Sequence, residues 1–178
     1  MFQAIYKLFE YILKTNVEEI KYISLYSNQF NRENESDRIS YPAAFLEIVP
    51  LETTQWLDSV QYSTVTVRLH IVSEFYTTFK DSDKLLDKSF EHLALLDKIY
   101  LMFNEKNDLD IPEEFYNNSY ITIGKMVRTG VDLSRDFGIK KDSIINFQFF
   151  LTDNSASAEK TYVEFTSQDD IAVNQITV

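Results

Sequence analysis

The sequence predicts an α+β fold, in which a single, mainly antiparallel β-sheet has an N-terminal helix and one long helix packed on one face. The first observation is the strict alternation over residues 64–72, where Val65, Val67, Leu69 and Ile71 alternate with Thr64, Thr66, Arg68 and His70. Successive side chains of a strand point to opposite faces, so this pattern predicts a strand with one buried and one solvated face. The other two observations are the helical periodicities over residues 2–14 and 83–104. The predicted order is α-β-β-β-α-β-β.

The N-terminal half is predicted to supply the first helix and three strands. Apolar residues recur at spacings of three and four over residues 2–14, which predicts an amphipathic helix. Three runs rich in aromatic and β-branched residues predict strands, namely 20–28, 41–49 and 61–75. The polar run 28–38 predicts a loop between the first two strands. Residues 51–61, with the single tryptophan Trp56, are predicted to connect the second strand to the third.

The C-terminal half is predicted to supply the long helix and two more strands. The helix over 83–104 begins at Ser82 or Asp83 as N-cap. Its core-facing stripe is predicted to hold Leu86, Phe90, Leu93, Leu96 or Asp97, Tyr100 and Phe103, and to be widened by Leu85, Leu95, Ile99 and Met102. Strands are predicted over 119–135, with a bulge at Gly124 or Gly130, and over 143–152, with a turn over 135–142 between them. Residues 1–152 therefore form the predicted domain, and the polar residues 153–178 form an extended C-terminal arm.

Composition and charge exclude several functional classes. The 178 residues are 44% hydrophobic, which is enough for one packed domain. The net charge is −11, and no run of lysine and arginine occurs, which argues against recognition of nucleic acid or of an anionic membrane surface. No apolar run approaches the roughly 20 residues that span a bilayer, so no membrane partner is expected. The absence of cysteine excludes disulfides, thiolate metal sites and a cysteine nucleophile.

No motif for catalysis, cofactor binding or metal binding is found, so catalytic, cofactor and metal residues are all predicted to be absent. The two histidines, His70 on the solvated strand face and His92 beside Glu91, lack a second ligand at helical spacing and are predicted to be surface or interface residues. The acids of residues 108–114 are predicted to be solvated loop residues, because catalytic carboxylate pairs need two contrasting environments.

Several residues are candidates for an interface with other proteins. Aromatic residues at strand ends and in connections are frequent interface anchors, although a place in the core is the alternative interpretation. The solvated strand face is a second candidate surface, and the aromatic patch of the C-terminal arm a third. The candidate interface residues are Trp56, Arg68, His70, Tyr76, Phe79, Tyr162 and Phe165.

The order of these elements resembles the tail-terminator and tail-completion proteins of tailed bacteriophages, which form rings at the head–tail junction. The segments that carry the resemblance are the helix Phe2 to Leu13, the strand Tyr41-Pro42-Ala43-Ala44-Phe45-Leu46-Glu47, the strand Val65 to Val72, the helix Asp83 to Phe103, and the strand pair from Gly130-Val131-Asp132 to Leu151. The resemblance covers residues 1–152. The loop 29–40 and the arm 153–178 depart from it and are expected to be contact arms.

The resemblance implies a structural virion protein of the neck or tail, not an enzyme and without a cofactor, made in the host cytoplasm. Its implied partners are further copies in a homo-oligomeric ring, the portal or connector, the tail proteins, and genomic DNA that passes through the channel without sequence-specific binding. An acidic channel would let DNA slide. Two other classes remain open: a small acidic binding or inhibitor protein that mimics DNA, and an enzyme with an unrecognised site.

Overall fold

The computed structural model describes residues 2–29, 38–57, 60–75, 82–105, 121–137 and 139–153. Its elements are α1 (Phe2–Asn16), β1 (Tyr22–Leu25), β2 (Ala43–Leu57), β3 (Val60–Glu74), α3 (Ser82–Glu105), β4 (Ile121–Ile123), β5 (Val127–Phe137) and β6 (Lys140–Asp153). The predicted α+β fold and the predicted order of elements are confirmed. The strand predicted over 119–135 is divided into β4 and β5, and the predicted bulge at Gly130 is a shift of register between Arg128 and Gly130.

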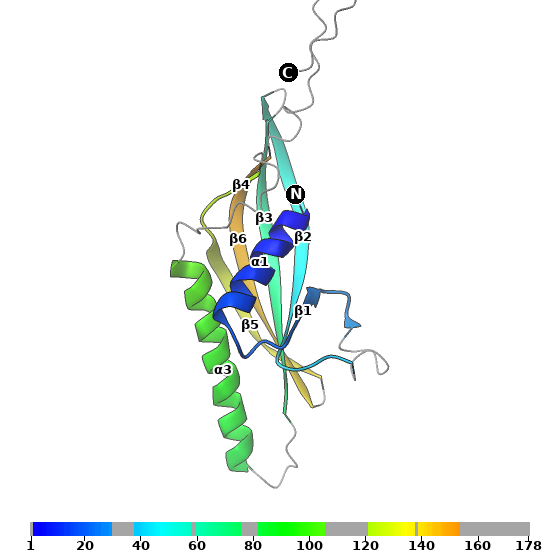
Figure 1. Ribbon diagram of the computed structural model, residues 1–178, viewed down its shortest axis with the longest axis vertical. Helices are drawn as coiled ribbons and strands as arrows, with labels where there is room; N and C mark the ends of the chain where they lie inside the picture. The colour runs from blue at the N-terminus through cyan, green and yellow to red at the C-terminus, as the bar shows by residue number, and fades with distance from the viewer. Residues whose placement is uncertain are drawn as a thin grey trace, which may run out of the picture.

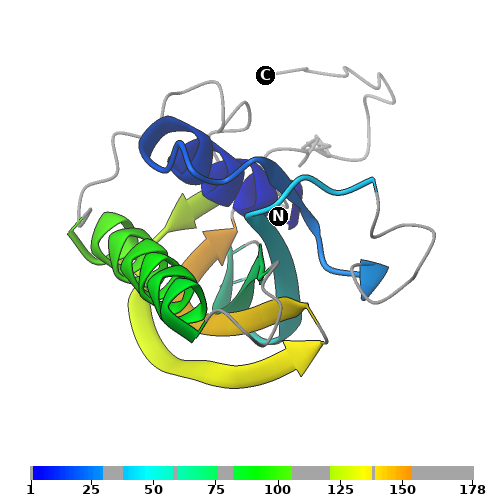
Figure 2. The same cartoon turned by 90° about the horizontal axis from the view of Figure 1, so that it is seen from below.

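The described strands form one curled sheet with the order β1-β2-β3-β6, in which β4 and β5 both pair with the outer edge of β6. Strand β1 runs parallel to β2, and the remaining pairs are antiparallel. Helices α1 and α3 lie on the same face of the sheet (Figures 1 and 2). The prediction that both helices cover one face is therefore confirmed.

Strands β2 and β3 form a hairpin that is much longer than predicted. The expected connection over 51–61 is wrong, because β2 continues to Leu57 and β3 begins at Val60. Residues of β2 beyond a register shift at 49–52 still pair with β3, as in Glu52 with Thr64 and Thr54 with Tyr62. The hairpin extends past α1 (Figure 1). Alternating apolar residues indicate that one face of a strand is buried, not that the strand is paired. The outer half of the hairpin lacks this alternation and was therefore not predicted as strand.

The turn predicted over 135–142 is also wrong in its extent. Strand β5 runs to Phe137 and β6 begins at Lys140, so the two strands form a second tight hairpin. The alternation predicted for β6 is confirmed on its core side, since Ile145, Phe147, Phe149 and Leu151 are all buried.

The main core fills the space between the two helices and the concave face of the sheet. Its centre is a group of aromatic rings, in which Phe9 of α1 stacks on Phe103 of α3 with centroids 4.7 Å apart. Phe103 in turn lies 4.8 Å from Phe147 of β6. These contacts join both helices to the central strands. The aliphatic residues around them include Ile5, Leu8, Ile12, Leu13, Val65, Val67, Leu69, Ile71, Leu95, Leu96 and Ile99.

Helix α3 is rotated relative to the prediction. Leu86, Phe90 and Leu93 were predicted to face the core but have exposed fractions of 54%, 59% and 38%. The buried stripe consists of His92, Leu95, Leu96, Ile99 and Phe103, so the prediction is confirmed at its C-terminal end and for the flanking Leu95 and Ile99, and is wrong at its N-terminal end. Both stripes have helical spacing, and a polar histidine on the second one made the first look more apolar.

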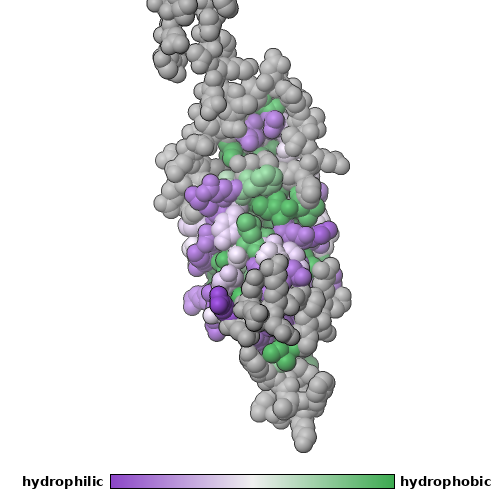
Figure 3. Space-filling model, turned by 90° about the vertical axis from the view of Figure 1, so that its right-hand side faces the viewer, coloured by the Kyte–Doolittle hydropathy of each residue, from purple (hydrophilic) through white to green (hydrophobic). Residues whose placement is uncertain are grey.

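A second, smaller core lies on the opposite face of the sheet. Ala43, Phe45 and Val72 form it, and Tyr26, Ile39 and Tyr41 pack against it. The chain that follows β1 and the segment that precedes β2 therefore cover part of the face that was predicted to be solvated. Seen from the side that carries β1 and β2, apolar residues gather in the middle of the molecule between hydrophilic ones (Figure 3).

Candidate functional site

His70 lies on the predicted face of β3 but is buried, with an exposed fraction of 1%, so its prediction as a solvated residue is wrong. Its Nδ1 lies 2.9 Å from Oδ2 of Asp142, which is equally buried. The ring of Tyr26 stacks on the imidazole at a centroid distance of 4.1 Å and an angle of 6°. His70 is therefore enclosed by β6 on one side and by the chain that follows β1 on the other.

Arg68 is the accessible member of this face. Its guanidinium contacts Oε2 of Glu47 at 3.4 Å, with the two side chains 47% and 34% exposed. The same Glu47 oxygen lies 3.5 Å from Nε2 of His70. Exposed pairs of this kind contribute less than about 1 kcal/mol, so Arg68 is free to exchange its partner at low cost. Its placement on a solvated surface agrees with the prediction, whereas its role at an interface stays a prediction.

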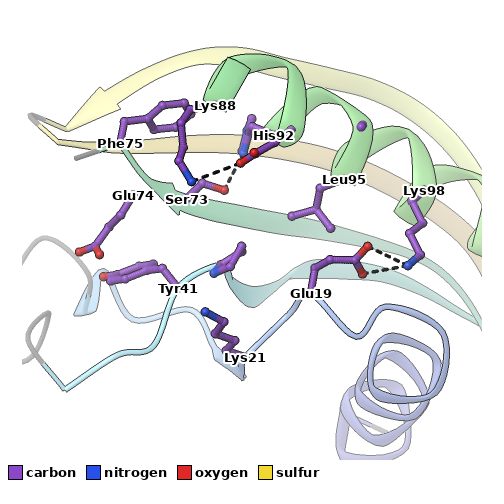
Figure 4. Close-up of a pocket in the computed structure, with 13 residues that line it drawn as sticks. Glu19, Lys21, Tyr41, Ser73, Glu74, Phe75, Lys88, His92, Leu95 and Lys98 are labelled. Atoms are coloured by element: carbon purple, nitrogen blue, oxygen red, sulfur yellow. Dashed lines mark hydrogen bonds and ion pairs between the residues drawn. The ribbon is translucent and has the colours of Figure 1, made fainter. Parts of the chain in front are cut away.

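His92 lies in a cleft of about 800 Å³ between α3, the end of β3 and the segments that precede β1 and β2 (Figure 4). Its exposed fraction is 2%, so the prediction of a surface histidine is wrong. Nδ1 lies 2.8 Å from Oγ of Ser73 in β3, and Nε2 lies 2.8 Å from Oγ of Ser143 in β6. Burial, together with the charge of Lys141, lowers the pKa of His92 to about 4.

The imidazole of His92 is therefore neutral near pH 7 and donates one hydrogen bond while accepting the other. Both nitrogens meet serine hydroxyls from different strands, so the group fastens α3 to the sheet. The same pairing of a hydroxyl and an imidazole base occurs in nucleophilic enzymes, where a third group orients the base. In this protein the second imidazole nitrogen meets the hydroxyl of Ser143, where such enzymes usually have a carboxylate. A neutral hydroxyl does not stabilise the positive charge that the imidazole gains when it takes a proton.

Four of the charged residues that line this cleft form two ion pairs. Lys98 of α3 holds both carboxylate oxygens of Glu19 at 2.8 and 2.9 Å, and this hydrogen bond keeps the pKa of Glu19 below its usual value. Lys88 contacts Glu91 at 3.3 Å. Among the residues that the structure describes, no group of three or more histidine, aspartate and glutamate side chains is placed to hold a metal ion.

Several exposed apolar residues lie on α3 and β5, on the side of α3 that faces away from the core. We call this the α3–β5 surface, and it consists of Leu86, Phe90, Leu93 and Leu101 of α3 with Val131 and Leu133 of β5. A groove of about 540 Å³ runs between the two elements and is lined by Leu93, Val131 and Leu133 among others. Arg128 crosses it, 3.6 Å above the ring of Tyr100. This surface was not predicted, because Leu86, Phe90 and Leu93 were expected to face the core.

The other candidate interface residues are only partly placed. Trp56 belongs to β2 rather than to a connection, and its side chain lies outside the described residues. Tyr76, Phe79, Tyr162 and Phe165, with the arm after Asp153 and most of the loop 29–40, lie outside them as well.

Comparison with known proteins leaves function to be inferred from the molecule itself. The sequence matches no protein-family model, and no curated protein sequence is significantly similar to it. Neither of the two described helices has the length and apolar character needed to cross a bilayer. The surfaces described above are therefore the basis for a functional proposal.

Proposed function

We propose that this protein is a structural subunit of a ring in the neck or tail of a tailed bacteriophage. In this role it joins the portal or connector to the tail and surrounds the DNA channel without catalysis. The proposal rests on the tail-terminator resemblance of residues 1–152 and on the α3–β5 surface.

The α3–β5 surface is the observation that carries the proposal. Phe90 and Leu86 each expose more than half of their surface on a helix whose opposite side already fills the core. Large exposed apolar residues that adjoin one another mark protein–protein contacts in soluble proteins. The aromatic and aliphatic residues here, beside an arginine that lies over a tyrosine ring, are the types enriched at the centre of interfaces.

The geometry favours a heterologous contact over a simple pair. A surface of α3 and β5 lies at one edge of the sheet, and the β1–β2 edge lies at the other. When two different patches on opposite sides of a subunit meet, copies join head to tail and close into a ring if the rotation permits. The net charge of −11 is compatible with a channel that repels DNA phosphates.

The alternative is a small acidic binding protein of the DNA-mimic type. It predicts a stable monomer whose acids gather on one face, and it assigns no role to the apolar residues of α3. The ring proposal predicts instead a cyclic oligomer, or a monomer that assembles only when proteins encoded by neighbouring genes are added.

Mass photometry and negative-stain electron microscopy of the full chain separate these cases. We expect closed rings, with or without the products of adjacent genes. A protein that stays monomeric in both samples and binds a DNA-binding protein would contradict the ring proposal.

A pair of neighbouring α3 variants provides the matched control. Phe90→Ser removes an exposed apolar side chain, and Glu91→Ser removes an exposed charge with the same replacement. We expect Phe90→Ser to weaken assembly at least tenfold, whereas Glu91→Ser leaves it within about twofold of the unaltered protein. Equal effects of the two variants would mean that the apolar side of α3 is not the contact.

A further inference from the structure

The sheet has two long edges whose backbone groups are only partly used. Strand β1 pairs with β2 over Ala43–Leu46 alone, which leaves Glu47–Leu57 without a partner on that side among the described residues. At the other edge, β5 pairs with β6 on one side over Val127–Phe137, and no described strand lies on its other side. Each open stretch is eleven residues long. Unpaired edges of this length are templates for pairing with another chain.

The β5 edge has the features of a strand-addition site. In this mode of recognition the backbone supplies affinity, and pockets beside the edge receive alternate side chains of the added strand. The groove between α3 and β5 adjoins this edge, with Leu93 on one wall and Val131 and Leu133 on the other. A strand added to β5 would therefore place every second side chain over this groove, whose lining also includes Asp97, Arg128 and Thr129.

Charge and direction both favour the β2 edge of another copy as the added strand. Residues 47–57 contain Glu47 and Glu52 and no lysine or arginine, whereas β5 contains Arg128 and Arg135 against two aspartates. The acidic β2 edge therefore meets an edge without net charge, whereas two β2 edges would repel each other. Strands β2 and β5 run in opposite directions within the sheet, so copies related by rotation about an axis along the strands pair these edges in antiparallel fashion.

We infer that the open edge of β2 in one copy pairs with the β5 edge of the next, so that the sheets of successive subunits are continuous around the ring. This inference rests on the proposed ring function and names the contact that builds it. Pro50 lacks an amide hydrogen and lies at the register shift of β2, so the pairing uses mainly Leu51–Leu57.

The absence of native cysteine makes site-directed cross-linking specific. The test variant carries Thr53→Cys in β2 together with Thr129→Cys in β5, in the full chain, and is treated with a short bis-maleimide after assembly. We expect a ladder of covalent oligomers on denaturing gels up to the size of the ring. The control pairs Thr53→Cys with Thr15→Cys at the exposed end of α1, where no ladder is expected.

Single variants and size measurement separate the possible failures. Covalent dimers from Thr129→Cys alone would show that two β5 edges pair with each other, and dimers from Thr53→Cys alone would show the same for β2. Either result overturns the inference. Rings by electron microscopy without a ladder from the double variant overturn the inference and leave the ring function standing. Absence of rings and of any ladder refutes both.

Discussion

Nδ1 of His70 and Oδ2 of Asp142 lie 2.9 Å apart, and both side chains are 99% enclosed by the protein. The second carboxylate oxygen, Oδ1, is buried without a hydrogen-bond partner among the described residues. Asp142 therefore depends on His70 as its one side-chain partner that the structure shows. A buried polar group that loses its partner keeps the full penalty of leaving water.

This dependence predicts that His70→Leu destabilises the protein strongly. We expect the free energy of unfolding to fall by about 3 kcal/mol, because the substitution leaves a buried carboxylate unpaired. Arg68→Leu is the control, since it breaks the exposed contact with Glu47 and is expected to change stability by less than about 1 kcal/mol. Urea unfolding followed by circular dichroism measures both. Similar losses in the two variants would contradict the buried pair.

The lowered pKa of His92 predicts a pH dependence of stability. The unfolded chain takes up a proton near pH 6.5, whereas the folded protein does so only near pH 4, so acidification across this window favours unfolding. The neutral imidazole of His92 contributes fully to the free energy of unfolding above pH 6.5, and this contribution is lost as the pH falls towards 4. Between pH 7 and 4.5 it amounts to about 2 kcal/mol.

His92→Gln tests this dependence, because glutamine can donate and accept hydrogen bonds but does not titrate. We expect the free energy of unfolding of the variant to fall less between pH 7 and pH 4.5 than that of the unaltered protein. Comparing the two proteins removes the common contribution of the carboxylates. An identical fall in both would show that His92 does not resist protonation.

The rotation of α3 predicts opposite outcomes at two phenylalanines of the same helix. Phe103 is buried between Phe9 and Phe147, so Phe103→Ala is expected to cost about 3–5 kcal/mol. Phe90 is 59% exposed, so Phe90→Ala is expected to change the stability of the monomer by no more than about 0.5 kcal/mol. Urea midpoints measured under monomeric conditions compare the two. Large losses in both variants would restore the stripe that the sequence predicts, in which both phenylalanines face the core.

Two glycines beside β6 are expected to differ in their tolerance of alanine. A Cβ at Gly124 would lie 3.2 Å from the backbone oxygen of Phe150, which accepts the hydrogen bond of the Gly124 amide and cannot move away freely. A Cβ at Gly130 would meet only the side-chain amide of Asn146, at 3.4 Å. We expect Gly124→Ala to lower the stability by about 1 kcal/mol or more and Gly130→Ala to have a smaller effect, as read by thermal unfolding.

The sequence predicts the elements of this fold well where burial imposes a period. The strand over Val65–Val72 and the core side of β6 alternate because one face is packed against helices, and both predictions are confirmed. The outer half of the β2–β3 hairpin has polar residues that pair without being buried, so its pattern resembles a connection. Periodicity in one dimension therefore reports the core but not the full length of the strands.

The candidate site was less accessible to prediction because it depends on neighbours distant in sequence. His70 is enclosed by Tyr26 and Asp142, which lie 44 residues before it and 72 after it. Similarly, His92 is accommodated in the buried stripe of α3 because Ser73 and Ser143 meet its two nitrogens. Such hydroxyl partners on two different strands have no local signature, and without them a histidine appears to belong on the surface.

The contacts of Phe9 set the order of events during synthesis. This residue of the first helix stacks on Phe103 and lies 6.0 Å from Phe147, so its partners leave the ribosome about 95 and 140 residues later. Strand β3 likewise waits for β6 before its second edge is occupied. The N-terminal helix thus completes its packing only when almost the whole domain has been translated, and a truncated product leaves part of the apolar side of this helix open to chaperones and proteases.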